Sequence, residues 1–244
     1  MARSPSRSLR FLAPLAATGS LIAVVFCAPS PSRAETPPAA PSASSPRTPI
    51  GPVLHIGDSF VDAGLQQALR PMFAAEETRY HSFGRVRAWL STWSDQAGLE
   101  TMMARYRPSL VLITLGANEM VDRTPERRAV LVRRLVRRLN GVPCVWVGHP
   151  VWRGVGPGLM HVVRRSCEPC RFFDSVPMSD TIRRQPDGIH PDKEGGALWA
   201  KAVFDWLQQE RDPARGPWGM RDAPRGEHGE ELDAGADGSS HDRP

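Results

Sequence analysis

The sequence predicts one α/β domain in which helices cover both faces of a parallel sheet. Short apolar runs alternate with longer amphipathic segments along the middle of the 244-residue chain, a pattern typical of strands joined by crossover helices. Polar side chains able to do chemistry follow several of these runs, as expected where ligands bind at the carboxyl ends of parallel strands. We therefore expect a single three-layer α/β/α domain with a flavodoxin-like sheet of about five strands in the order 2-1-3-4-5.

Five apolar runs predict the strands, and five amphipathic segments predict the helices. We expect strands at residues 53–56, 80–83, 111–115, 144–147 and 171–173, and helices at about residues 62–70, 94–105, 125–140, 157–165 and 193–209. The third helix is the best marked, because Thr124 can cap it, Pro125 suits its first turn, and Gly141 can end it in the left-handed conformation.

The two ends of the chain differ in composition from the middle, so we place the domain at residues 52–210. Residues 1–34 combine early arginines with an apolar stretch and then small residues, the pattern of a secretory signal peptide. Residues 35–51 are mainly Pro, Ala, Ser and Thr and predict a linker, and residues 211–244 predict a disordered polar tail. This interpretation makes the protein an exported one, periplasmic or extracellular.

Two alternatives for the N-terminal segment stay open. It could remain as an uncleaved membrane anchor, although its apolar stretch is shorter than the roughly 20 residues of a spanning helix. Cys27 could be acylated as in a lipoprotein, although the bulky Phe26 precedes it. We expect a monomer with no stable membrane span in the mature chain.

The formal net charge of +5 raises the question of a nucleic-acid partner. The arginine doublets at residues 133–134 and 137–138 alternate with the apolar stripe of an amphipathic helix. They are therefore interpreted as its solvated face, and we expect no nucleic-acid binding.

Three short motifs, each following a predicted strand, together carry the residues of an ester-hydrolysing site. Ser59 ends a Gly-Asp-Ser motif, Asn118 ends Gly-Ala-Asn, and Asp187 and His190 bound Asp-Gly-Ile-His. A serine nucleophile needs an imidazole to take its proton and a carboxylate to orient that imidazole. An asparagine amide can donate a hydrogen bond to the oxyanion of the tetrahedral intermediate. The motifs therefore predict that Ser59, His190 and Asp187 are catalytic, with Asn118 as an oxyanion donor.

Each motif alone has a plainer interpretation. Gly-Asp-Ser is commonly just a turn, Asn118 could be a loop residue or a cap, and Asp187 could cap the segment that follows it. Their occurrence in order, each after a predicted strand, favours the catalytic interpretation.

These motifs resemble the sequence blocks of the SGNH (GDSL) hydrolase family, whose name lists its Ser, Gly, Asn and His. The resemblance covers residues 53–207, and Gly84 fits the short glycine block. Phe60 and Glu119 stand where members usually carry Leu and often Asp. The resemblance implies an oxyanion hole made by the backbone N–H groups of Ser59 and Gly84 with the amide of Asn118. This chemistry needs neither a metal nor another cofactor.

The substrate is predicted only as a class. Arg85, His149, Trp152 and Arg153 follow predicted strands, and such side chains could line a saccharide cleft, although Trp152 could equally belong to the core and the arginines to the solvated surface. Export and a small domain favour short-chain, acetyl-like esters on carbohydrate or cell-envelope glycan. An O-acetyltransferase, and a non-catalytic glycan-binding module on the same fold, remain the alternatives.

The cysteines after the signal segment are expected to be structural. Cys144 lies in an apolar run and is expected to be buried. Cys167 and Cys170 form a Cys-Glu-Pro-Cys motif, for which we expect a local disulfide in an exported protein. Zinc binding would need a second ligand pair, and a redox role a thioredoxin-like context.

Overall fold

The computed structural model describes residues 51–222, which form a five-stranded parallel sheet. The strands are β1 (Val53–Gly57), β2 (Tyr80–Gly84), β3 (Leu110–Thr114), β4 (Cys144–Val147) and β5 (Arg171–Phe173). Their order is β2-β1-β3-β4-β5, and all neighbours pair in parallel. The predicted flavodoxin-like order is confirmed. The predicted signal peptide, the linker up to residue 50 and residues 223–244 of the predicted tail lie outside the described residues.

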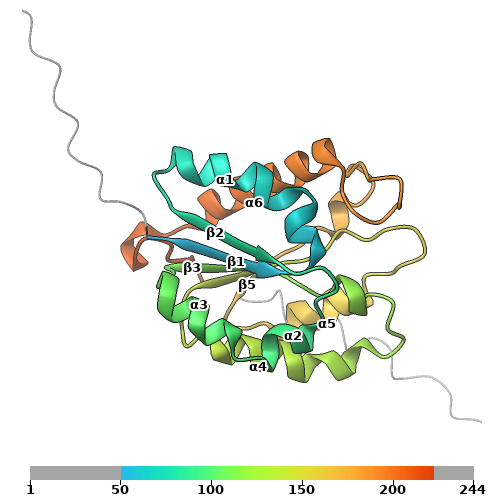
Figure 1. Ribbon diagram of the computed structural model, residues 1–244, viewed down its shortest axis with the longest axis horizontal. Helices are drawn as coiled ribbons and strands as arrows, with labels where there is room; N and C mark the ends of the chain where they lie inside the picture. The colour runs from blue at the N-terminus through green and yellow to red at the C-terminus, as the bar shows by residue number, and fades with distance from the viewer. Residues whose placement is uncertain (1–50, 223–244) are drawn as a thin grey trace, which may run out of the picture. The chain divides into compact units, whose positions relative to one another are not determined.

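Helices cover both faces of the sheet (Figure 1). On one side lie α1 (Gln66–Ala75) and α6 (Lys193–Glu210), and on the other α2 (Leu90–Ser94), α3 (Gly98–Tyr106), α4 (Ala129–Arg138) and α5 (Gly158–Ser166). The predicted three-layer arrangement is therefore confirmed. None of the helices within residues 51–222 is long and apolar enough to cross a membrane.

Strand β3 shows why a central strand of this sheet is a continuous apolar run. Leu110 and Leu112 pack into the cluster under α1 and α6, whereas Val111 and Ile113 pack into the cluster under the other helices. All four side chains are fully buried. A strand covered on both faces cannot alternate apolar with polar residues, which is the signature of a buried parallel sheet.

Two predicted helices are interrupted. The helix expected at residues 94–105 is the pair α2 and α3, separated by a short turn. The helix expected at residues 62–70 begins as a π-helical turn, Val61–Leu65, in which Gly64 has φ +131°. A Cβ atom on Gly64 would lie 2.8 Å from Cα of Gly196 in α6, so close backbone packing requires glycine at this position.

The start of the third predicted helix also differs from expectation. A 3-10 turn, Pro125–Arg128, precedes α4, and the side chain of Thr124 makes no capping hydrogen bond. Its hydroxyl instead donates to Asp122 at 3.3 Å, because that carboxylate already accepts the backbone N–H of Thr124. At the other end of α4, Gly141 has the expected positive φ of +78°.

The predicted tail starts too early, because residues 211–222 pack against the domain. Trp218 is fully buried, and its indole N–H donates to the carbonyl of Gly51 at 3.2 Å. The backbones of Arg211 and Met220 pair as an antiparallel bridge. The indole in an otherwise polar stretch was the signal that could have extended the domain boundary.

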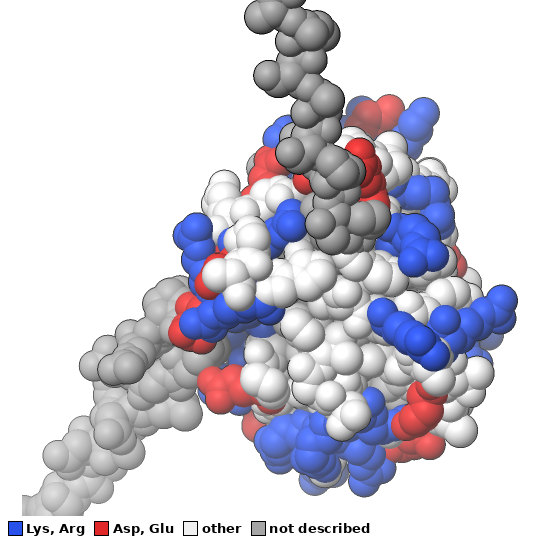
Figure 2. Space-filling model, turned by 90° about the vertical axis from the view of Figure 1, so that its left-hand side faces the viewer, with Lys and Arg blue, Asp and Glu red and all other residues white. Residues whose placement is uncertain are grey.

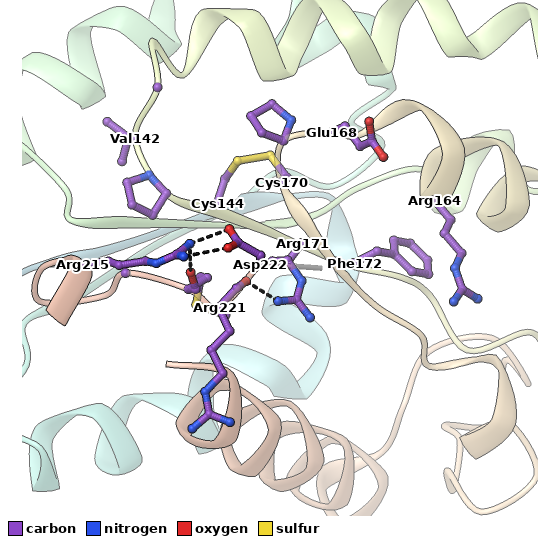
Figure 3. A pocket seen from close by; sticks show the side chains of 15 residues that line it. Val142, Cys144, Arg164, Glu168, Cys170, Arg171, Phe172, Arg215, Arg221 and Asp222 are labelled. Atoms are coloured by element: carbon purple, nitrogen blue, oxygen red, sulfur yellow. Dashed lines mark hydrogen bonds and ion pairs between the residues drawn. A yellow bond between two sulfur atoms is a disulfide. The ribbon is translucent and has the colours of Figure 1, made fainter. Parts of the chain in front are cut away.

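The disulfide joins Cys144 to Cys170, so the predicted Cys167–Cys170 bridge is wrong (Figure 3). Cys144 begins β4 and Cys170 directly precedes β5, the neighbouring parallel strand. Their Cα atoms therefore lie 4.7 Å apart, within the range of a disulfide. Cys167 is a buried free thiol, and burial raises its pKa to about 12. It therefore has little thiolate character at neutral pH.

Candidate active site

Three of the predicted residues meet at the carboxyl edge of the sheet. Oγ of Ser59, two residues after β1, lies 2.8 Å from Nε2 of His190. Nδ1 of the same imidazole lies 2.7 Å from Oδ2 of Asp187, in the loop between β5 and α6. The three side chains thus form the hydrogen-bonded chain that moves a proton from a serine hydroxyl to an imidazole.

Asp187 both orients the imidazole and caps its own turn. Its Oδ1 accepts the backbone N–H groups of Ile189 at 2.8 Å and His190 at 3.0 Å. Desolvation opposes ionisation of Asp187, but the hydrogen bond from His190 and these two backbone bonds together hold its pKa below the usual range. The ionised carboxylate fixes the proton of His190 on Nδ1, which leaves Nε2 to accept the hydrogen of Ser59.

Arg184 ties the turn that carries His190 to the loop after β4. Its guanidinium donates to the carbonyl of Ile189 and, at 2.6 Å, to that of Val151. The backbone N–H of Gln185 also donates to the carbonyl of His190 at 2.8 Å. The exposed turn is thereby held mainly through backbone groups.

Asn118 follows β3 and is oriented by the loop after β2. Its Nδ2 donates to the carbonyl of Ala88 at 2.8 Å, and one of its two N–H groups remains for another acceptor. The adjacent Glu119 accepts the backbone N–H of Leu90 at 2.6 Å, and burial raises its pKa. These two bonds join the Asn118 turn to the segment that follows Gly84.

Gly84 ends β2, with its Cα paired to that of Gly57. A Cβ atom at residue 84 would lie 2.5 Å from Oδ1 of Asp62, so a side chain there would collide with this carboxylate. Steric contact with Asp62 therefore requires glycine at residue 84, independently of the role in the oxyanion hole that the resemblance implies.

Asp58 is a residue of the site that sequence reasoning missed. Its carboxylate is fully buried and accepts the backbone N–H groups of Phe60 at 3.0 Å, Gly116 at 3.0 Å and Ala117 at 2.9 Å. Nε2 of His149 lies 3.2 Å from Oδ2. Desolvation disfavours the charge, but His149 and the backbone donors outweigh it and lower the pKa of Asp58. Its position in the motif, one residue before Ser59, gave no sign of these partners.

The four predicted substrate-binding residues have different surroundings. The prediction for His149 is wrong, because its side chain is fully buried against Asp58. Trp152 is half-buried and stacks on Phe60 with the ring centroids 5.7 Å apart. Arg85 is exposed and donates to the side chain of Gln96 at 3.0 Å.

Arg153, the fourth of these residues, is exposed. Phe60 links Trp152 to the site, because its ring also lies 5.0 Å from the imidazole of His190. Trp152 is thus connected to His190 through Phe60, whereas substrate binding by Arg153 stays a prediction.

A pocket lies at the opposite edge of the sheet from Ser59. This pocket, of about 510 Å³, borders the amino ends of β4 and β5 beside the disulfide (Figure 3). Arg171 lies 2.8 Å from Glu210, and Arg215 lies 2.5 Å from Asp222. On the face at this edge, basic and acidic side chains are interspersed (Figure 2). None of Ser59, Asp187 and His190 lines this pocket.

No family model and no curated protein sequence matches this chain. Solved structures with the same fold include TesA, with a TM-score of 0.54 and 20% identity over 65% of this chain and 98% of that chain. The psychrotrophic esterase EstA from Pseudoalteromonas sp. gives 0.52 and 16% over 65% and 97%. An acetylxylan esterase from Geobacillus stearothermophilus, solved as a catalytic mutant, gives 0.51 and 16% over 65% and 95%. The predicted resemblance is thus confirmed at the level of the fold.

Proposed function

We propose that the protein is a serine ester hydrolase of the SGNH (GDSL) type. The observation that carries this proposal is the hydrogen-bonded chain from Ser59 through His190 to Asp187, at 2.8 Å and 2.7 Å. The esterases that share the fold support it.

The reaction runs in two halves. Oγ of Ser59 bonds to the ester carbonyl carbon while Nε2 of His190 takes the hydroxyl proton, and Asp187 stabilises the imidazolium. The tetrahedral intermediate expels the alcohol, which takes the proton from His190 and leaves an acyl-serine. Water then attacks the acyl carbon with His190 again as base, and the acid leaves with Ser59 restored.

The oxyanion of each tetrahedral intermediate needs preorganised donors. We assign the backbone N–H groups of Ser59 and Gly84 and the second N–H of Asn118 to this role. The carbonyl of Ala88 supports the assignment for Asn118, because it holds the amide in one orientation.

Ser59→Ala tests the proposal. We expect p-nitrophenyl acetate hydrolysis to fall by at least about 10³-fold, since the variant has no nucleophile. Ser91→Ala is the matched control, because Ser91 is an exposed serine on α2 that has no part in the proposed reaction, and it should retain the parent rate. A Ser59→Ala variant within tenfold of the parent would exclude the serine mechanism.

We further propose that the acyl group is short and that its carrier is a carbohydrate. Trp89 is 45% exposed in the segment joined to Asn118, and an exposed aromatic ring can stack on a sugar. An apolar acyl pocket would gain about 0.8 kcal/mol, or roughly fourfold in rate, for each methylene. We expect kcat/KM to fall from p-nitrophenyl acetate to butyrate to octanoate, and acetylated xylan to release acetate. Preference for octanoate would contradict this substrate class, and faster acetyl transfer to added oligosaccharide would identify a transferase.

Export is likewise a proposal. It is supported by the signal-like pattern of residues 1–34 and by the Cys144–Cys170 disulfide, which suits an oxidising compartment. Mass spectrometry of the mature protein should find an N-terminus near Glu35. An intact Met1 would instead support the uncleaved anchor.

A further inference from the structure

Asp58 connects three segments that are far apart in the sequence. Its Oδ1 accepts the N–H of Phe60, next to Ser59, and its Oδ2 accepts the N–H groups of Gly116 and Ala117, next to Asn118. The third connection is the imidazole of His149, after β4, which lies 3.2 Å from Oδ2 and 3.3 Å from Oδ1. The carboxylate of Asp58 thus joins the turn that carries Ser59 to the turn that carries Asn118.

Among residues 51–222, His149 is the only side chain that hydrogen-bonds to Asp58. Both side chains are fully buried, so the carboxylate depends on these donors in place of water. The ring of Phe60 packs against the imidazole in a T-shaped arrangement with the centroids 4.8 Å apart, and the ring of Trp199 lies farther away, at 6.5 Å. Loss of the imidazole would leave an apolar wall beside a buried charge, which is strongly unfavourable.

The buried position of His149 does not satisfy the hydrogen-bonding capacity of its own imidazole. Nδ1 of His149 is buried and has no hydrogen-bond partner among the described residues, and such an unsatisfied atom costs stability. An apolar side chain at residue 149 would avoid that cost but would leave Asp58 without a side-chain hydrogen-bond donor. His149 therefore stabilises the carboxylate of Asp58, and through Oδ2 the turn that carries Asn118.

We propose that His149 is a positioning residue for the esterase reaction, acting through Asp58 on the turn that carries Asn118. The proposal rests on the proposed function. Asp58 accepts two successive N–H groups of this turn, where Gly116 has φ +124°. When Asp58 loses His149, its carboxylate takes up a proton or shifts, and the turn moves with it. A displacement of about 1 Å at an oxyanion donor is enough to lower the rate by roughly 10²-fold.

The first experiment separates positioning from packing with two variants. His149→Leu keeps the volume but removes the donor, and we expect kcat to fall by about 10²-fold with KM changed by less than about threefold. His149→Gln can present an amide N–H to Asp58 and should retain kcat within about tenfold of the parent. His161→Leu, an exposed histidine on α5, is the control and should change neither constant. Equal kcat values for the Leu and Gln variants would overturn the proposal.

A double variant tests the route through Asn118. If His149 acts on the same turn, His149→Leu should lower kcat by less than about threefold in an Asn118→Ala background, because the donor it positions is already absent. A full loss of about 10²-fold in that background would show that His149 acts elsewhere, and would overturn the proposal.

Amide hydrogen exchange provides a readout that does not depend on any ester substrate. In His149→Leu, exchange at Gly116 and Ala117 should accelerate by at least about tenfold relative to Leu112 in the centre of β3. Unchanged exchange, or equal acceleration at all three amides, would overturn the positioning role. If the parent hydrolyses no ester, the proposed function fails, while this comparison still decides whether His149 holds the turn.

A third variant keeps the test valid if His149→Leu does not fold. Asn at residue 149 is one methylene shorter than Gln, so its amide should not reach Asp58 as well. We then expect slower exchange at Gly116 and Ala117 in His149→Gln than in His149→Asn. The same exchange rates in both variants would overturn the proposal.

Discussion

Removing the Cys144–Cys170 disulfide should destabilise the domain by an amount that follows from its loop. The two cysteines are 26 residues apart, and closing a loop of this length removes chain entropy worth about 3.5 kcal/mol from the unfolded state. For a domain of this size, about 1 kcal/mol corresponds to roughly 2 to 4 °C in Tm. We therefore expect reduction, or the Cys144→Ala/Cys170→Ala variant, to lower Tm by about 7 to 14 °C.

Reductant dependence identifies the bonded pair. Tm of the parent and of Cys167→Ala should fall on addition of reductant, whereas Tm of Cys144→Ala/Cys170→Ala should not respond. Cys167→Ala is the matched control because Cys167 is buried but outside the bridge. If Cys167→Ala abolishes the response, the bridge is the Cys167–Cys170 pair that the motif alone suggests, and the reasoning from strand adjacency fails.

Peptide mapping identifies the bonded cysteine pair independently of the Tm measurements. Trypsin should cut after Arg138, Arg153, Arg165 and Arg171. The observed bridge links peptide 139–153 to peptide 166–171, whereas a Cys167–Cys170 bridge would leave peptide 139–153 unlinked with a free thiol.

Three further predictions concern single side chains. Asn118→Ala should lower kcat by about 10² to 10³-fold, the usual effect of losing one oxyanion donor, in the p-nitrophenyl acetate assay; an unchanged kcat would remove it from the site. Trp218→Ala should destabilise the domain by about 3 to 5 kcal/mol in urea without changing kcat, because Trp218 contacts Gly51 at the far edge of the sheet; a loss under about 1 kcal/mol would restore the early tail boundary. Burial lowers the pKa of His55 to about 3, although Asp58 opposes the shift. Only the unfolded chain then binds a proton at this site below about pH 6.5, so stability should fall by about 1.4 kcal/mol per unit as the pH drops from there towards 3. His55→Gln should show a correspondingly smaller decline, and an identical pH dependence would refute a neutral buried His55.

The sheet could be predicted because its determinants are local. The three central strands, β1, β3 and β4, are short runs buried on both faces, and the motif residues Ser59 and Asn118 follow the ends of two of them. The helix starts could not be predicted in the same way. The π-helical turn at Val61–Leu65 depends on Gly64 meeting Gly196, 132 positions later in the chain, and no local pattern encodes that approach.

The disulfide error shows that sequence distance is a poor guide to spatial distance in a parallel sheet. The spacing of Cys167 and Cys170 suggested a local bridge. The predicted strand order already placed the fourth and fifth strands side by side, with Cys144 at the start of one and Cys170 just before the other. The signal for the correct pair was therefore present in the predicted topology.

The substrate-binding predictions rested on position alone, and position does not determine side-chain direction beyond a strand end. Within β4, residues alternate between the two faces, so Val145 and Val147 pack on one side and Trp146 on the other. His149 lies two residues past the end of β4, where alternation no longer applies, and it turns inward to Asp58. Ser59 and Asn118 also lie past strand ends, but their motifs carried independent chemical information.

The two halves of the site depend on different kinds of support. Ser59 and Asn118 belong to turns that are each hydrogen-bonded to the fully buried carboxylate of Asp58, the first through Oδ1 and the second through Oδ2. His190 and Asp187 lie on an exposed turn, with 28% and 42% of their side chains accessible. Water competes with the hydrogen bond between them, and their geometry relies on the ring of Phe60 and the backbone bonds around the turn. Phe60, which stands where the motif usually carries leucine, therefore packs near the imidazole of His190. It supports the ring on a turn where the hydrogen bond between His190 and Asp187 is exposed to solvent.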